Sequence, residues 1–504
     1  GLVGSEMCIR DRIGLAGAGA SSGMAMAHWE IQGWMILILG WVFVPFYSRS
    51  MVYTMPEFLE RRYNPQSRTI LSVISLVSYV LTKVAVTVYA GGLVFQQVFG
   101  IKELWGIDFF WIAAIGLVVL TALYTIFGGM KSVLYTSVLQ TPILLLGSLI
   151  ILVLGFKELG GWDEMMRVCG AVTVNDYGDT MTNLIRSNDD ANFPWLGALI
   201  GSAIIGFWYW CTDQFIVQRV LSGKNEKEAR RGTIFGAYLK LLPVFLFLIP
   251  GMIAFALHQK YIGAGGEGFL PMLANGTANA DAAFPTLVAK LLPAGVKGLV
   301  VCGILAALMS SLASLFNSSA MLFTIDFYKR FRPETPEKKL VGIGQIATVV
   351  IVILGILWIP IMRSVGDVLY TYLQDVQSVL APGIAAAFLL GICWKRTSAQ
   401  GGMWGLIAGM IIGLTRLGAK VYYSNAGEVA DSTFKYLFYD MNWLFFCGWM
   451  FLFCIIVVIV VSLATEAPTA EKIQGLVFGT ATKEQKAATR ASWVHSVSYT
   501  HLRA

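Results

Sequence analysis

The sequence predicts an all-α protein that crosses a membrane many times, and three features support this fold class. Hydrophobic residues make up 56% of the chain and charged residues only 13%, whereas an average soluble domain carries about 25% charged residues. Glycine is abundant, with 52 residues, as is common where membrane helices pack closely. Apolar runs of about 20 residues, the length of a membrane-crossing helix, recur along the chain. We therefore expect a polytopic α-helical membrane protein.

The apolar runs define the expected spans in chain order. They lie at residues 31–47, 69–98, 108–128, 134–155, 194–217, 232–257, 290–325, 341–362, 370–393, 402–422 and 443–464. A shorter, glycine-rich apolar segment at 13–27 precedes them and is too short to cross a bilayer alone. The spans 69–98 and 290–325 are too long for one straight crossing, so we expect them to be tilted, broken or protruding.

Loops rich in Lys and Arg alternate with loops that are poor in both. The basic loops contain Arg49, Arg61, Arg62 and Arg68; Lys131; Arg219, Lys224, Lys227, Arg230 and Arg231; Lys329, Arg330, Arg332, Lys338 and Lys339; and Lys395 and Arg396. The basic-poor loops include 158–193 and 258–289. Because cytoplasmic loops are enriched in Lys and Arg, we expect the basic loops in the cytoplasm. The net charge of +7 thus reflects the topology of the loops and not nucleic-acid binding. We expect the protein to lie in the plasma (inner) membrane.

The two ends of the chain differ from this pattern. Residues 1–12, "GLVGSEMCIRDR", are polar immediately before a membrane segment, and residues 496–504, "SVSYTHLRA", follow an ordinary solvated tail. Both resemble translated adaptor sequence, so we interpret 1–12 as a non-native scar and 466–504 as a cytoplasmic tail with a non-native end. We also expect the natural N-terminus to be missing. Natural polar termini are the alternative.

The sequence contains no constellation typical of an enzyme or a metal site. Its seven cysteines show no CxxC pair, and it has four histidines. We therefore expect neither a haem site nor a catalytic triad, and we predict that the protein is not an enzyme.

Polar residues within the spans are candidate functional groups, because an ionisable side chain at the bilayer centre costs roughly 2.5–3.5 kcal/mol on insertion scales. Glu30 begins the span 31–47, Lys240 lies inside 232–257, and Gln374 precedes Asp375 inside 370–393. Structural alternatives exist for each. Glu30 could be an interfacial carboxylate at a helix N-terminus, Lys240 a snorkelling lysine, and Gln374 an interhelical hydrogen-bonding group.

The second half of the span 194–217 contains the consecutive aromatic residues Trp208, Tyr209 and Trp210. On a helix they point in different directions, so at most two can face a solute path. A flat amphipathic ring beside a polar cavity suits stacking on a sugar. An interfacial aromatic belt is the alternative.

Small and hydroxyl residues form one helix face in "AALMSSLASLFNSS" (306–319). Ala307, Ser310, Ser311 and Ser314 recur at spacings of three and four. Their hydroxyls and a freed carbonyl could bind Na⁺, a hard cation that takes oxygen ligands. A packing face of small residues fits the same pattern, and the residues alone leave both interpretations open.

Several long segments resemble the sodium:solute symporter family, in particular its sodium–glucose cotransporter branch. They are "GLAGAGASSGMAMAHWE", "YTMPEFLERRY", "FGGMKSVLYTSVLQT", "WYWCTDQFIVQRVLSGKN", "AALMSSLASLFNSSAMLFTIDFYKRFRP" and "YLQDVQSVLAPGIAAAFLLGICWKR". The resemblance covers residues 13–465. It implies inverted five-helix repeats of the leucine-transporter (LeuT) kind, at 13–157 and 194–393. The segment 158–193 would be an extracellular loop, and 394–465 would add further transmembrane helices.

The resemblance also implies roles for individual residues. Ala307 would supply a carbonyl, and Ser310 and Ser311 hydroxyls, to a coupling Na⁺, which leaves Ser314, Ser318 and Ser319 as packing groups. The sugar-binding residues would be Glu30, Tyr209, Lys240 and Gln374, with Tyr209 stacking on the sugar as an inner gate beside Trp210. No organic cofactor is implied.

Three positions depart from the family pattern. The first half of the broken first core helix, which supplies further Na⁺ ligands in the family, should precede Ile13, but the chain there reads "GLVGSEMCIRDR". Ser137 stands where many relatives have Asp, and Ala313 stands where two-sodium members have a hydroxyl residue. We therefore expect one Na⁺ per sugar.

These observations predict a secondary active transporter that couples inward Na⁺ movement to uptake of a hexose of the glucose or galactose type. A symporter for another solute, such as myo-inositol, a carboxylate or an amino acid, is one alternative. A sugar sensor on the same fold that does not transport is another. The expected partners are a small sugar and the lipid bilayer; the sequence makes no prediction of oligomeric state.

Overall fold

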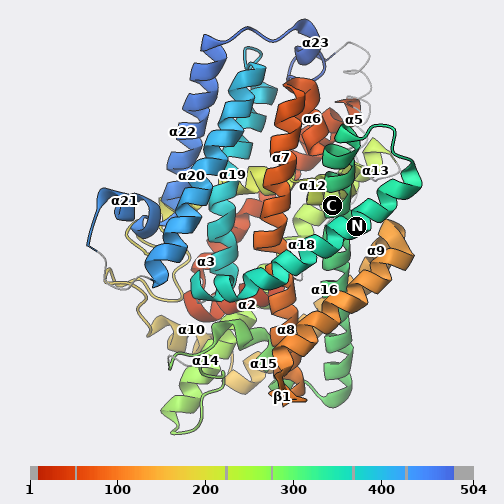
Figure 1. Cartoon of the computed structure of the whole chain (residues 1–504). Coiled ribbons are helices and arrows are strands. Elements are labelled where there is room, and N and C mark those ends of the chain that lie inside the picture. The colour runs from red at the N-terminus through yellow and green to blue at the C-terminus, as the bar shows by residue number, and fades with distance from the viewer. Residues whose placement is uncertain are drawn as a thin grey trace, which may run out of the picture.

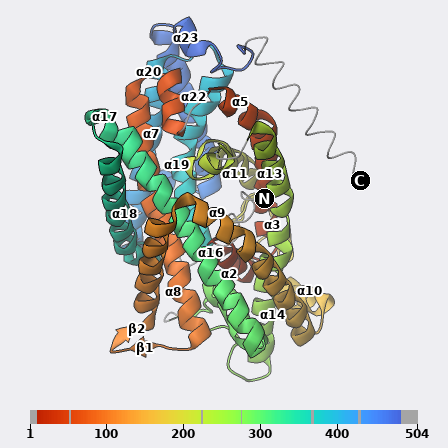
Figure 2. The same ribbon diagram turned by 90° about the vertical axis from the view of Figure 1, so that its right-hand side faces the viewer.

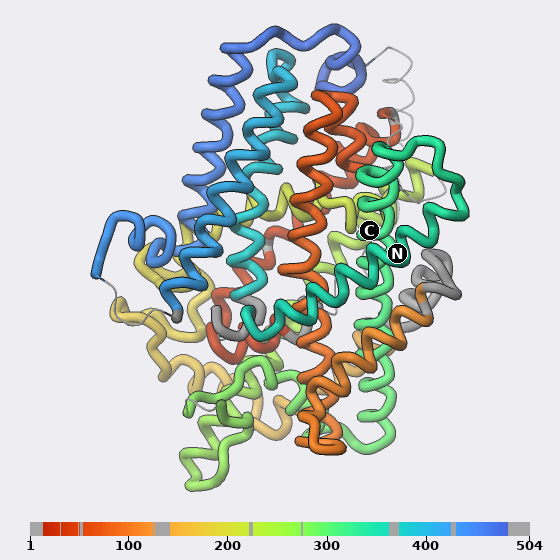
Figure 3. Tube along the Cα trace, in the orientation of Figure 1, coloured from red at the N-terminus to blue at the C-terminus, as the bar shows by residue number. Residues whose placement is uncertain are grey.

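The computed structural model describes residues 10–50, 54–221, 225–273, 276–365, 369–425 and 430–481, which Figure 3 traces in colour. For several helical residues, among them 126–141, only the backbone is described. Residues 1–9 of the set-aside N-terminal segment and the whole of 496–504 lie outside the described part. Arg10, Asp11 and Arg12 continue into the first helix.

The first half of the chain is helical apart from one small hairpin. In the labels of Figure 1, where η marks a 3-10 or π turn, its elements are α2 (Arg10–Ser22), α3 (Ala25–Glu30), η1 (Ile31–Trp34), α4 (Met35–Ile38), η2 (Leu39–Phe43), α5 (Val44–Ser50), α6 (Met55–Arg62), α7 (Pro65–Ser78), η3 (Tyr79–Val84), α8 (Ala85–Phe99), β1 (Glu103–Leu104), β2 (Ile107–Asp108), α9 (Phe109–Leu159), α10 (Trp162–Gly170), α11 (Trp195–Gly206), η4 (Phe207–Thr212) and α12 (Gln214–Leu221). β1 and β2 pair in an antiparallel manner.

The second half continues in the same way. Its elements are α13 (Glu226–Leu239), η5 (Val244–Leu248), α14 (Ile249–Gly263), η6 (Ala280–Ala282), α15 (Ala283–Leu291), α16 (Ala294–Met321), η7 (Leu322–Tyr328), α17 (Lys329–Phe331), α18 (Glu337–Val365), α19 (Leu369–Cys393), α20 (Ala399–Asn425), α21 (Thr433–Lys435), η8 (Tyr436–Asp440), α22 (Trp443–Ala464) and α23 (Ala470–Ile473).

Local sequence signals set several of the helix ends. The side chain of Thr54 caps α6 by accepting a hydrogen bond from the Glu57 amide at 3.2 Å, and Asn64 caps α7 by accepting one from the Ser67 amide at 2.8 Å. Such polar caps satisfy amides that have no partner within the helix. α8 ends at Gly100 in the left-handed conformation (φ 67°), which glycine adopts without strain.

Ten of the eleven spans predicted from the apolar runs correspond to helical segments of the described residues, and the run 108–128 corresponds only to a shorter apolar helix. The described residues contain 10 helical segments that are long and apolar enough to cross a membrane, and a shorter apolar helix at Phe109–Leu123. They are Ala25–Ser48, Pro65–Phe99, Pro142–Leu159, Trp195–Thr212, Glu226–Gly263, Ala294–Phe331, Glu337–Ile361, Tyr372–Cys393, Ala399–Ser424 and Trp443–Ala464.

One expected pair of spans differs. The sequence suggested a loop between 108–128 and 134–155, but the backbone forms a single helix, α9, across both. No proline lies between the two runs, and a glycine inside a helix costs only about 1 kcal/mol relative to alanine, so helical hydrogen bonding continues through Gly128 and Gly129. Figure 2 shows the first and last parts of α9 as two inclined arms, with both ends at the β1 and α10 side of the molecule.

The two ends of the molecule match the expected distribution of loops. α6 and α23 lie at one end in Figure 1, and β1 and α15 lie at the other. The first end carries the loops rich in Arg and Lys, and the second carries the loops 158–193 and 258–289, which are poor in basic residues. This arrangement agrees with the alternation expected from the positive-inside rule.

Two features interrupt the regular helical spans: a short first helix, α2, and an extended residue, Asp213, between η4 and α12. α2 has 13 residues, or about 20 Å at 1.5 Å per residue, which is too short to cross a bilayer. It packs against η5, α14, α15 and α19. Its contact with α14 is close, because a Cβ at Gly251 would lie 2.1 Å from the carbonyl oxygen of Ala16. The second break separates η4 from α12 at Asp213, whose backbone is extended (φ −77°, ψ 128°).

The loop 158–193 is attached to the end of α2. The amide of Met24 donates to the carbonyl of Met181 at 2.8 Å, and the guanidinium of Arg186 donates to the carbonyl of Ser22. Arg186 is buried and also pairs with Asp190 at 3.4 Å. Burial lowers the pKa of the Arg186 guanidinium, while Asp190 raises it in part. The loop therefore covers this end of α2 through specific contacts.

Candidate functional site

The residues assigned to Na⁺ lie on one buried face of α16. Ala307, Ser310 and Ser311 are 0%, 1% and 6% exposed. Within the described part of the chain, the Oγ atom of Ser311 makes no hydrogen bond although it is buried. A buried hydroxyl normally has a partner, because an unmade hydrogen bond costs free energy. Its uncompensated oxygen suits a hard cation, which binds hydroxyl and carbonyl oxygens.

Ser318, a later serine of the same helix, makes protein contacts, whereas the Oγ of Ser319, like that of Ser311, has no hydrogen-bond partner among the described residues. The Oγ of Ser318 donates to the carbonyl of Ser314 at 2.9 Å and accepts a hydrogen bond from the Nε2 of Gln218 on α12. Ser318 thus joins α16 to α12, as a packing group would. Ser314 and Ser319 are also buried.

Two of the residues assigned to the sugar form a buried ion pair. The Nζ of Lys240 lies 2.6 Å from the Oε2 of Glu30, and both residues are 3% exposed. Glu30 is the last residue of α3, and Lys240 follows α13 directly. Gly33 permits this approach, because a Cβ there would lie 2.8 Å from the Cγ of Lys240.

The aromatic residues of η4 lie beside this ion pair. Tyr209 and Trp210 contact each other edge to face, with ring centroids 4.6 Å apart, and the Nζ of Lys240 lies 5.9 Å from the centroid of Trp210. Such an arrangement is weakly attractive for a cation. Both aromatic residues lie in the π turn that precedes the break at Asp213. The structure therefore brings Glu30, Lys240, Trp210 and Tyr209 into one cluster.

Gln374 lies on α19, which packs against η4 and α2. Its side chain is 4% exposed, and its Oε1 has no hydrogen-bond partner among the described residues. The following residue, Asp375, is bound by Lys420 on α20. Gln374 thus presents an uncompensated acceptor from a helix that packs against η4, the turn that carries Tyr209 and Trp210.

Sequence reasoning missed several buried charged residues, among them Arg416 and Asp326, and one of them, Lys83, lies beside Tyr209. Lys83, in the middle of the run 65–99, pairs with Asp213 at the break between η4 and α12. A lysine within "YVLTKVAV" was a visible signal, since charged residues in apolar spans are rare. Its partner is 130 residues away in sequence, so no local pattern predicts the pair.

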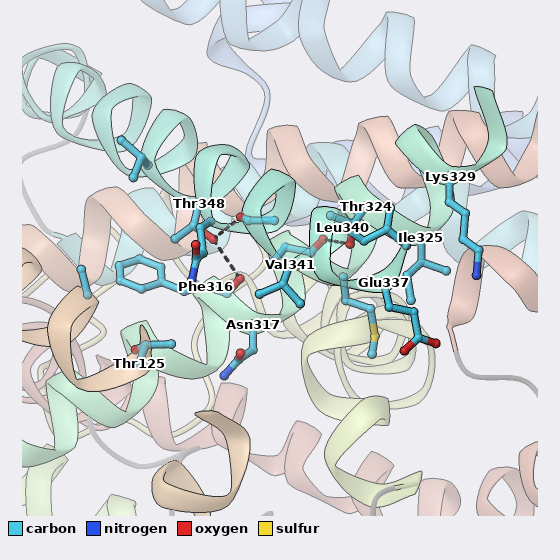
Figure 4. Close-up of a pocket in the computed structure, with 16 residues that line it drawn as sticks. Thr125, Phe316, Asn317, Thr324, Ile325, Lys329, Glu337, Leu340, Val341 and Thr348 are labelled. Atoms are coloured by element: carbon cyan, nitrogen blue, oxygen red, sulfur yellow. Dashed lines mark hydrogen bonds between the residues drawn. The ribbon is translucent and has the colours of Figure 1, made fainter. Parts of the chain in front are cut away.

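Figure 4 shows a pocket away from these clusters. It has a volume of about 620 Å³ between α9, α16, η7 and α18, with Thr125, Asn317 and Thr348 on its walls and Lys329 and Glu337 nearby. None of the residues assigned to Na⁺ or to the sugar lines it. Ser137 is one of the positions at which the sequence departs from the family pattern, and its side chain lies outside the described residues.

Buried charged residues within many apolar spans are typical of a multi-pass membrane transporter. The fold agrees. A solved Na⁺-coupled sialic acid symporter, in a substrate-bound outward-open state, superimposes with a TM-score of 0.69 at 20% identity, over 93% of this chain and 89% of that one. The predicted fold class, an all-α membrane protein of the LeuT kind, is confirmed.

The chain belongs to the sodium:solute symporter family, whose model matches residues 1–409. That match begins within the segment set aside as non-native. The human sodium/myo-inositol cotransporter 2 is 36% identical over 481 residues, covering 93% of this chain and 70% of the relative. The zebrafish (Danio rerio) sodium/glucose cotransporter 4 is 35% identical over 91% of this chain and 71% of its own length. The sheep (Ovis aries) sodium/glucose cotransporter 1 is 37% identical over 90% and 70%.

These similarities confirm the family and its cotransporter branch, which the sequence motifs predicted. They also confirm that the chain belongs with transporters and not with enzymes. Membership implies Na⁺ as the coupling ion. The relatives carry different solutes by name, myo-inositol in one case and glucose in others, so the solute is not determined by the family.

Proposed function

We propose that this protein couples inward movement of Na⁺ to the uptake of a neutral polyol, either a hexose of the glucose or galactose type or the cyclitol myo-inositol. The buried Glu30–Lys240 pair beside Tyr209 and Trp210 carries this proposal. A carboxylate accepts hydrogen bonds and an ammonium group donates them, so the pair matches hydroxyl groups, which do both. The nearby aromatic face suits the apolar side of a sugar ring.

The same cluster argues against an anionic solute. The opposite charges of Glu30 and Lys240 cancel. The uncompensated acceptor, Oε1 of Gln374, lies on the neighbouring helix α19. A carboxylate carrier would be expected to place an arginine or a free helix N-terminus at its site. Myo-inositol fits as well as a hexose, because it also carries a ring of hydroxyls, and one of the most similar relatives is a sodium/myo-inositol cotransporter.

The carbonyl of Ala307 and the hydroxyls of Ser310 and Ser311 are proposed to bind the coupling ion. Their oxygens are neutral and buried, so they can replace water around Na⁺ without burying an anion. Ala313 offers no side-chain oxygen on this helix, and we therefore propose one Na⁺ per solute.

Na⁺ can drive uptake only if it binds one state of the protein better than the other. We propose that it stabilises the state open to the extracellular side, and that repeats at 13–157 and 194–393 then move relative to each other. The membrane potential adds roughly 2.3 kcal/mol per charge per 100 mV. The basic loops would face the cytoplasm, and the protein would lie in the plasma membrane.

Uptake in reconstituted vesicles tests this proposal. The chain should accumulate labelled myo-inositol, glucose or galactose when a Na⁺ gradient is imposed, and replacement of Na⁺ by choline should abolish accumulation. Unchanged uptake in choline would contradict Na⁺ coupling. Solute binding without accumulation in the wild-type protein would instead support the sensor alternative.

A further inference from the structure

One buried ionic cluster that the proposed sites do not use is formed by Tyr79, Lys83 and Asp213, here called the Lys83 cluster. We infer that the Lys83 cluster is a positioning element for the inner gate, which holds α12 against η3 and keeps the ring of Tyr209 in its closed arrangement. The inference rests on the proposed function, because it assigns the cluster a role in that transport cycle. Tyr79 and Lys83 belong to η3, and Asp213 lies at the break between η4 and α12.

Asp213 joins the two halves of the broken helix and starts the second half. Its carbonyl accepts the first backbone hydrogen bonds of α12. Its Oδ1 atom accepts hydrogen bonds from the hydroxyl of Tyr79 at 2.8 Å and from the amide of Phe215 at 3.1 Å. Its Oδ2 atom is bound by the Nζ of Lys83. Both carboxylate oxygens are thus satisfied, and two of the three donors belong to η3.

The ammonium group of Lys83 is enclosed by three aromatic rings. Its Nζ lies 4.4 Å from the centroids of Tyr79 and Phe215 and 5.4 Å from that of Tyr209. Lys83 is 1% exposed and Asp213 is 5% exposed. Cation–π attraction is strengthened when the cation is desolvated in this way. The third ring is that of the proposed gate, so Lys83 contacts the break and the gate at once.

α12 is also bound at further points, and one of them leads toward the sodium site. The Oε1 of Gln214 accepts a hydrogen bond from the amide of Met55 at the start of α6 at 2.8 Å, and Gln218 donates to Ser318 on α16. α16 carries Ser310 and Ser311. A contiguous set of contacts therefore connects the proposed Na⁺ ligands, through α12 and Asp213, to Tyr209. If α12 moves away from η3 during transport, the Lys83–Asp213 contact must break.

A purely structural ion pair would behave differently when both partners are replaced. Removing one member leaves the other charge buried without compensation, which destabilises the fold whatever the role of the pair. Removing both charges together avoids that penalty, and replacing buried pairs by uncharged groups is often neutral for stability. The double variant Lys83→Met with Asp213→Asn therefore separates folding from gating.

The test uses the full chain in proteoliposomes, as wild type, as both single variants and as the double variant. Three quantities are measured: the thermal midpoint of the purified protein, the efflux of ²²Na⁺ without solute, and alkylation of Cys211. Cys211 is a buried free thiol two residues before Asp213. A membrane-impermeant maleimide is applied from the side of the basic loops, and peptide mass mapping distinguishes Cys211 from the other cysteines.

We expect both single variants to lower the thermal midpoint and the double variant to restore it. In the double variant, Na⁺ efflux and alkylation of Cys211 should nevertheless be about tenfold faster than in wild type. This is the change expected from losing a hydrogen bond to a charged group. Its solute accumulation should fall in proportion. A matched control, Lys435→Met with Asp431→Asn, removes an exposed i,i+4 pair and should change none of these quantities.

A double variant with the thermal midpoint, Na⁺ efflux and Cys211 alkylation of wild type would overturn the inference and leave the cluster as a structural pair. If the double variant fails to fold, Tyr79→Phe removes one hydrogen bond to Asp213 and keeps both charges; unchanged efflux and alkylation in that variant would overturn it equally. If the wild type accumulates no polyol, the proposed function fails, whereas Cys211 alkylation still decides the role of the Lys83 cluster.

Discussion

Replacing Glu30 with glutamine is the most direct perturbation of the proposed sugar site. The change preserves the shape of the side chain but removes the carboxylate that lies 2.6 Å from the Nζ of Lys240. Both side chains are almost completely buried, at 1% and 2% exposure. Loss of one partner of such a pair costs about 3–5 kcal/mol, which is a large part of the roughly 5–15 kcal/mol that stabilises a typical protein.

Two assays measure the consequence. The thermal midpoint of purified Glu30→Gln should fall well below that of wild type, and its half-saturating solute concentration should rise because an acceptor for hydroxyl groups is weakened. Glu164→Gln is the matched control. Its carboxylate pairs with Arg167 at 2.7 Å on an exposed surface, where ion pairs contribute about 0–1 kcal/mol, so both quantities should remain close to wild type.

A second variant separates stability from solute binding. Glu30→Gln combined with Lys240→Met removes both charges and should recover most of the thermal midpoint, since no uncompensated charge is left. Uptake should not recover, because two hydrogen-bonding groups are gone. Wild-type half-saturation in Glu30→Gln, or full recovery of uptake in the double variant, would refute the assignment of this pair to the solute.

Three further predictions follow from other parts of the structure. Ser311→Ala should raise the Na⁺ concentration needed for half-maximal uptake, whereas Ser319→Ala, at another buried serine of α16, should leave it unchanged. Equal Na⁺ dependence in both variants would show that this face of α16 serves helix packing and does not bind Na⁺. Gly251→Ala should lower the thermal midpoint, with a cost of about 1–3 kcal/mol, because the new Cβ would meet the carbonyl of Ala16; Gly263→Ala, which meets no atom within 4 Å, is its control. Burial raises the pKa of the Cys169 thiol to about 12, so the thiol stays protonated at pH 8 and should resist alkylation until the pH approaches that value; rapid modification at pH 8, detected by mass spectrometry, would show that this thiol is accessible.

Much of the fold was predictable because its signals are local. Apolar runs such as 443–464 and the charges of the loops depend only on neighbouring residues, and they located the spans and their orientation pattern. α9 shows the limit of this approach. Lys131 between two apolar runs was typical of a loop, but no proline lies between those runs and the helix continues through Gly128 and Gly129; Pro142 follows further along the same helix.

The candidate site was only partly predictable for a related reason. Glu30 and Lys240 each stood out as an ionisable residue in an apolar context, yet nothing in their local sequence indicated that they form a pair. Their contact depends on α13 packing against α4 and η2, which follow α3 in the same span, with Gly33 leaving room for the lysine stem. Asp213 was visible beside the aromatic residues, whereas Lys83 went unnoticed until the structure placed it against Asp213.

The π turns η3 and η4 have a consequence for how these spans tolerate change in length. A π turn holds one residue more than the α-helical ladder requires, and each residue corresponds to about 100° of rotation around the helix axis. Deleting a single residue within 207–212 would therefore let α11 continue as a regular α-helix up to Asp213 while changing the direction of the side chains inside the turn. A shortened η4 of that kind would keep the hydrophobicity of the span and lose the alignment of Tyr209 with Lys83.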